Sequence, residues 1–139
     1  MLILASFTVA PVALGQYSAK LDCADYALET MSPEAAADLC RGVTYSNLTY
    51  VLQCATESGL ELPALDLARA CQQATAGDIS PIWTCLEESI AREFSSAAAG
   101  NLCQGVSYRS YSQRFDCLVY ATEGGLAIEA AARLCGGPL

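Results

Sequence analysis

The segment AAADLCRG at residues 35–42 recurs twice along the chain, as AAGNLCQG at 98–105 and as AAARLCGG at 130–137. A more divergent copy, LARAC, occupies residues 67–71. The copies are rich in alanine, the residue with the highest helix propensity, and each contains one cysteine. Self-similarity at a fixed period is typical of repeat architectures. The sequence therefore predicts a series of small helical units.

The spacing of the cysteines defines these units. Successive cysteines are separated by 17, 14, 17, 14, 18, 14 and 18 residues, which gives a period of 31 to 32 residues with two cysteines in each unit. We expect one domain over residues 16–139, divided into repeats 23–53, 54–84, 85–116 and 117–139. The cysteines are Cys23, Cys40, Cys54, Cys71, Cys85, Cys103, Cys117 and Cys135.

Apolar residues inside the units follow the spacing of an amphipathic helix. Leu48, Val51, Leu52 and Ala55 occupy positions i, i+3, i+4 and i+7, on one helical face. The strict alternation that is typical of strands persists nowhere. We therefore expect an all-α fold of four stacked helical hairpins. Each should contain a first helix of roughly 10 to 13 residues, a tight turn and a second helix of about 8 to 10 residues.

Local signals mark the ends of these helices. Ser32 and Ser80 each precede a proline, an arrangement that favours a capping hydroxyl followed by the first helical residue. Gly42, Gly105 and Gly136 follow the second cysteine of their units, where a left-handed C-terminal cap favours glycine. We expect helices to begin and end at these residues.

The cysteines also indicate a compartment. The chain contains no histidine and no Cys-x-x-Cys motif, so neither a zinc site nor a thioredoxin-like dithiol is expected. Eight evenly placed cysteines without such motifs favour a disulfide framework in an exported protein.

Two pairing schemes are compatible with the repeat. Cysteines could pair within each unit, for example Cys23 with Cys40, so that every loop midpoint falls at a predicted tight turn. Alternatively, each unit could be joined to the next, as in Cys40 with Cys54. The first scheme is preferred because it uses all eight cysteines, whereas the second leaves Cys23 and Cys135 without sequential partners.

The N-terminus supports export. Residues 1–15 carry no charge and contain an apolar run followed by Ala13-Leu14-Gly15, which is typical of a signal peptide and its cleavage site, although no basic residue precedes the run. The run is too short for a membrane span, which needs about 20 residues. We expect a secreted or periplasmic protein with no stable membrane span after cleavage.

Charge and composition exclude several functions. The formal net charge of −8 makes nucleic acid a poor partner. Without histidine or a nucleophile motif, no catalytic residue is assigned and no enzymatic activity is expected. No cofactor or metal site is assigned either. Trp83 is expected in the core.

The candidate binding residues lie in the loops between units. Tyr45 and Tyr108 each stand five residues after the second cysteine of a unit, and Arg109 and Tyr111 accompany the latter. Loops along one edge of a helical repeat array commonly form its binding face, and tyrosine and arginine are favoured at protein contacts. Asn47 begins the triplet Asn-Leu-Thr, a candidate N-glycosylation site.

Together these features favour a non-catalytic protein-interaction or structural module whose partner is an unknown protein or cell-surface component. The alternative is a carrier of a small apolar, lipid-like ligand held between the alanine-rich helices.

Overall fold

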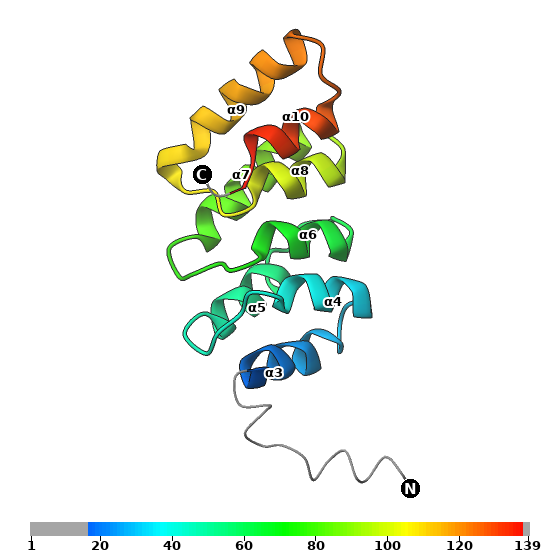
Figure 1. The fold of residues 1–139 in the computed structure, drawn as a ribbon, viewed down its shortest axis with the longest axis vertical. Coiled ribbons are helices and arrows are strands. Elements are labelled where there is room, and N and C mark those ends of the chain that lie inside the picture. Colours follow the sequence, from blue (N-terminus) through cyan, green and yellow to red (C-terminus); the bar gives the residue numbers. More distant parts are fainter. Residues whose placement is uncertain (1–16, 138–139) are drawn as a thin grey trace, which may run out of the picture.

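The computed structural model describes residues 17–137, which contain eight α-helices and no strand. The fold is therefore all-α, as predicted. The helices form four hairpins, each of a first and a second helix (Figure 1). From here on a unit means one such hairpin with its flanking loop residues, so that the first to fourth units cover residues 17–42, 43–73, 74–105 and 106–137. Their bounds are α3 Ser18–Ala27, α4 Pro33–Cys40, α5 Leu48–Thr56, α6 Ala64–Cys71, α7 Ile79–Ala91, α8 Ser96–Cys103, α9 Tyr108–Glu123 and α10 Ile128–Cys135. The expected signal peptide, residues 1–15, lies outside the described residues.

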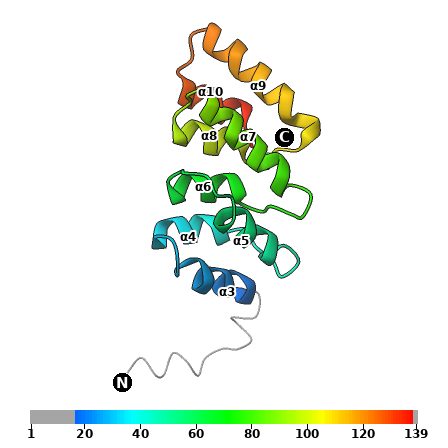
Figure 2. The same cartoon turned by 180° about the vertical axis from the view of Figure 1, so that it is seen from behind.

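The four hairpins stack into an elongated array. The second helices α4, α6, α8 and α10 form one column, in which each packs on the next, and the first helices lie beside them (Figures 1 and 2). The turns within hairpins lie along one edge of the array and the loops between units along the opposite edge. This arrangement places residues of equal repeat position at successive levels of one stack.

One disulfide joins the two helices of every hairpin. The Cα–Cα distances are 5.6 to 5.7 Å, and the cysteines in the described chain leave no free thiol. Pairing within units is confirmed, and the alternative that joins successive units is wrong. The bonded pairs are Cys23–Cys40, Cys54–Cys71, Cys85–Cys103 and Cys117–Cys135.

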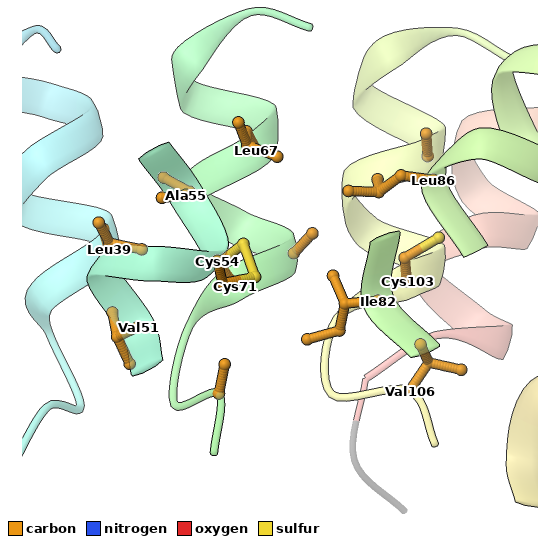
Figure 3. Packing of buried hydrophobic residues seen from close by; sticks show 14 of the residues in the cluster. Leu39, Val51, Cys54, Ala55, Leu67, Cys71, Ile82, Leu86, Cys103 and Val106 are labelled. Carbon is orange, nitrogen blue, oxygen red and sulfur yellow. A yellow bond between two sulfur atoms is a disulfide. The ribbon is translucent and has the colours of Figure 1, made fainter. Parts of the chain in front are cut away.

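The core runs through the stack between the two rows of helices. Buried leucine, isoleucine and valine side chains surround the disulfides, and alanines fill the remaining contacts (Figure 3). Because alanine has little apolar area to bury, each unit gains modest hydrophobic energy. A disulfide that closes a loop of this length contributes about 3 kcal/mol in the chain-entropy model. The crosslinks therefore provide a substantial share of the stability.

The second helices all have eight residues, as expected, but the first helices range from 9 to 16. Helix α9 is the longest because a reciprocal capping box between Ser107 and Ser110 starts it early. In the second unit the related segment is an open turn, in which Asn47 Oδ1 accepts a hydrogen bond from the Thr44 backbone N–H at 2.8 Å. Helix α5 therefore begins later relative to its cysteine, and because it also ends soon after Cys54, at Thr56, it has nine residues.

The serine caps are correct in one unit and wrong in another. Ser32 Oγ accepts a hydrogen bond from the Ala35 N–H and caps α4, with Pro33 at the first helical position. Ser80 is not a cap, because α7 already begins at Ile79. The Asp78 carboxylate closes a turn by accepting from the Thr75 N–H at 3.0 Å, which starts the helix earlier.

The glycine caps also need correction. Gly105 is left-handed, with φ +64°. Gly136 is extended at φ −94°, and Gly137 takes the left-handed conformation instead, at φ +79°. Gly42 is not left-handed. A Cβ there would collide with the side chain of Gln73, so glycine is favoured at this position because two units approach closely.

Candidate binding surfaces

Tyr45 lies in the loop between α4 and α5, and Tyr108 is the first residue of α9, directly after the loop from α8. Both loops lie on the same edge of the array (Figure 1). Each side chain is 61% exposed. The Tyr45 hydroxyl donates a hydrogen bond to Asp22 Oδ2 at 2.8 Å, and the Tyr108 hydroxyl lies 2.7 Å from Ser80 Oγ. In both cases the partner belongs to the first helix of the preceding unit. The two rings are thus exposed but held at their outer ends.

The two anchors have opposite effects on ionisation. The hydrogen bond to the Asp22 carboxylate, followed by burial and the Asp22 charge, raises the pKa of Tyr45 above the ordinary 10.0. Hydrogen bonds with Ser80 and Thr84 lower the pKa of Tyr108.

Arg109 and Tyr111, the two candidate residues near Tyr108, lie on different faces of α9. Arg109 is exposed at the start of α9. Tyr111 is half-buried and packs against Phe115, with ring centroids 5.2 Å apart. Burial, followed by the negative charge of Glu88, raises the pKa of Tyr111. The structure therefore places Arg109 beside the exposed tyrosine and turns Tyr111 toward the packed face.

Asn47, the candidate glycosylation site, is half-buried at the start of α5, where its Oδ1 closes the turn with Thr44. Thr49 of the same triplet is exposed. Glycosylation at Asn47 stays a prediction.

Four hollows on the described surface are small. Their volumes are about 160 Å³ between α9 and α10, and about 240, 240 and 230 Å³ elsewhere. Pockets for drug-sized ligands usually have volumes of about 300 to 1,000 Å³. The hollow between α9 and α10 is lined by Ser110, Gln113, Arg114, Cys117, Leu134 and Cys135.

Arg114 is the polar residue that sequence reasoning missed. Its side chain is buried, and its Nη1 donates to the carbonyl oxygens of Leu102 at 2.8 Å and Gln104 at 2.5 Å, while Nη2 donates to Gly137 at 2.8 Å. Burial lowers the pKa of its guanidinium. The signal was a charged residue in line with Tyr111 and Leu118 on the inner face of α9. Arg114 therefore links the C-terminal ends of α8 and α10, and its role is structural.

Hydrogen bonds between second helices continue this polar contact along the stack. Gln72 Nε2 donates to the Asp38 carbonyl oxygen at 2.8 Å, and Gln104 Nε2 donates to Gln72 Oε1 at 2.6 Å. Asp38, Gln72 and Gln104 belong to three successive units. Polar side chains at this edge therefore join neighbouring units, and they are already paired.

Within residues 17–137, no group of three metal-ligating side chains could hold an ion. In the same part of the chain, no helix has both the length and the apolar character needed to cross a bilayer. Comparisons with models of known families, with curated proteins and with solved structures gave no match. The structure defines the chain as a small, disulfide-rich, all-α protein with a repeat-like arrangement of hairpins.

Proposed function

We propose that this protein is a non-catalytic, extracytoplasmic interaction module that binds a protein or cell-surface partner through the edge carrying Tyr45 and Tyr108. One observation carries the proposal. Two exposed aromatic rings stand at related positions of the second and fourth units, and each is held by a hydrogen bond to the preceding unit.

Anchoring matters because binding usually costs the entropy of ordering side chains. A ring already held at its hydroxyl loses less freedom on contact with a partner. Tyrosine also supplies a large apolar face at low entropic cost, which makes it common in binding surfaces. Arg109, exposed beside Tyr108, adds a positive charge to an otherwise acidic protein.

Export is part of the proposal. Four disulfides are typical of proteins from oxidising compartments, and they agree with the signal-like start of the sequence. N-terminal sequencing of exported protein should therefore begin near Gln16. Intact Met1 on protein purified from the cytosol would contradict it.

The binding test compares three immobilised proteins. They are the wild type, the variant Tyr45→Ala/Tyr108→Ala, and a control with two other exposed tyrosines replaced, Tyr26→Ala/Tyr120→Ala. Each is incubated with the extracellular and surface proteins of the producing cells. A partner should be retained by wild type and control and reduced about tenfold or more by loss of Tyr45 and Tyr108. If no protein distinguishes the variants, the proposed edge is wrong.

The carrier alternative has a separate readout. Native mass spectrometry of the exported protein would show a co-purified lipid as a fixed mass increment. The small surface hollows favour a bare chain mass.

A further inference from the structure

The residue before the second cysteine has the same packing in three units and a different one in the fourth. Leu39, Ala70 and Leu102 are fully buried, each at 0% exposure. Leu134, at the same repeat position, is 67% exposed. The first three units are followed by another unit in the stack, whereas nothing in the described chain packs on the outer face of the fourth.

The disulfides show the same asymmetry. The six cysteines of the first three units are at most 3% exposed, whereas Cys117 and Cys135 are only half-buried and line the hollow beside Leu134. Each disulfide is therefore covered mainly by the unit that follows it. We call the exposed surface around Leu134, Leu126 and this hollow the trailing face.

At the opposite end of the stack, the first unit exposes residues whose counterparts in later units are covered by the preceding unit. Leu21 stands two residues before its first cysteine and is 49% exposed, while Leu52, Trp83 and Phe115 at that position are partly or fully buried. Ala37 is exposed, while Ala68 and Ala132 at its position are fully buried. We call the surface around Leu21 and Ala37 the leading face.

Contacts between units show what the two faces do when they meet. Phe115, at the Leu21 position, stacks on Phe94 of the preceding unit with centroids 6.2 Å apart. Phe94 itself occupies the position of Leu126, which is 43% exposed in the fourth unit. Trp83, also at the Leu21 position, donates to the Cys54 carbonyl of the unit before it. A leading face and a trailing face therefore meet at the junction of the second and third units and at that of the third and fourth.

Charge disfavours one of the possible contacts between copies. Residues 17–41 contain two basic and five acidic side chains, whereas residues 108–137 contain three of each. Two leading faces would repel each other because both carry net negative charge. A trailing face carries no net charge, so it does not repel a leading face. Stacked repeat proteins usually have polar outer faces on their end units, which keep them soluble. Leu134 and Leu126 depart from that rule.

We propose that the trailing face of one molecule binds the leading face of a second copy of this chain, continuing the stack from one molecule to the next. The contact repeats a junction that already occurs within the chain. Because it is heterologous, it leaves one free face at each end and allows open growth. The inference is independent of the tyrosine edge.

The test uses three variants of the exported protein, all at exposed positions: Leu21→Arg on the leading face, Leu134→Arg on the trailing face, and Ser46→Arg as a control. Ser46 is exposed in the loop between α4 and α5, away from both ends of the stack, and its counterparts Gly77 and Arg109 in the later units are exposed as well. Far-UV circular dichroism checks that each remains folded. Sedimentation velocity over a concentration series measures the average mass against that of the exported monomer.

Wild type and Ser46→Arg should increase in mass with concentration beyond a dimer. Leu21→Arg and Leu134→Arg should each remain monomeric, because each has lost one of the two faces. An equimolar mixture of these two variants should form a heterodimer and no larger species, because each contributes the face that the other lacks.

Three results would overturn the proposal. Wild type could remain monomeric up to its solubility limit. Leu21→Arg could form dimers that Leu134→Arg cannot, which would indicate pairing of two trailing faces. The mixture could show no mass above that of its components, which would exclude complementary faces.

Discussion

Trp83 and Cys54 are joined across the boundary between the second and third units, where the indole Nε1 donates a hydrogen bond to the Cys54 carbonyl oxygen at 3.0 Å. Cys54 lies in the last turn of α5, whose carbonyls have no partner within the helix. Trp83 thus supplies a missing hydrogen bond to another unit and packs its half-buried ring against the core.

Replacing Trp83 should separate these two contributions. Trp83→Phe keeps most of the packing and loses the hydrogen bond, so we expect the free energy of unfolding to fall by about 1 kcal/mol. Trp83→Ala loses both and should cost about 3 kcal/mol. Urea unfolding followed by circular dichroism measures both values, with Tyr120→Ala expected within about 0.5 kcal/mol of wild type. A Trp83→Phe variant as stable as wild type would refute the role of the hydrogen bond, whereas equal losses for the two variants would refute the contribution of packing.

Arg114→Ala should be among the most damaging single substitutions on α9. It leaves the carbonyls of Leu102, Gln104 and Gly137 without their charged donor, and we expect a loss of about 3 kcal/mol in thermal or urea unfolding. Arg114→Lys should recover part of the loss, because an ammonium group can reach only some of these oxygens. The exposed Arg109→Ala is the matched control and should be nearly neutral. An effect of Arg114→Ala no larger than that control would contradict the structural role.

The four disulfides should not be reduced together. Cys117–Cys135 is half-buried, whereas the other six cysteines are at most 3% exposed, so limiting reductant should attack this bond first. Alkylation and peptide mass spectrometry at low protein concentration would identify the first labelled pair. Early labelling of Cys54 or Cys71 would show that burial does not control the order.

Tyr45 and Tyr108 should titrate in opposite directions from the ordinary value of 10.0. Absorbance titration of the phenolate in Tyr45→Phe and Tyr108→Phe, by difference from wild type, assigns each hydroxyl. The raised pKa of Tyr45 means that its contribution to stability is complete below the unfolded value and is lost as the pH rises through the folded value. In Asp22→Asn the Tyr45 pKa should fall. If Asp22→Asn leaves the titration of Tyr45 unchanged, its hydrogen bond to Asp22 is not formed in solution.

The cysteine spacing and the helical spacing of apolar residues were sufficient to predict the all-α hairpin fold. They reduced the disulfide pairing to two schemes, whose midpoints both fall in turns or loops, and the scheme that uses all eight cysteines is the one observed. Burial was harder to predict. Leu39, Leu102 and Leu134 occur in nearly the same local sequence, yet only Leu134 is exposed, since the difference depends on whether another unit follows. The role of Arg114 was hidden for a similar reason. Its partners are carbonyls at helix ends, which carry no signal in the sequence.

Confinement of each disulfide to one hairpin also determines how the molecule would bear tension. A pull applied at the two ends would pass across the bond from Cys23 to Cys40 and bypass the residues between them, and likewise in every later unit. Only the connectors 41–53, 72–84 and 104–116 could be drawn out fully. The stack would lengthen by extension of these connectors, while each disulfide-bonded hairpin would keep its end-to-end length and its turn would carry no load.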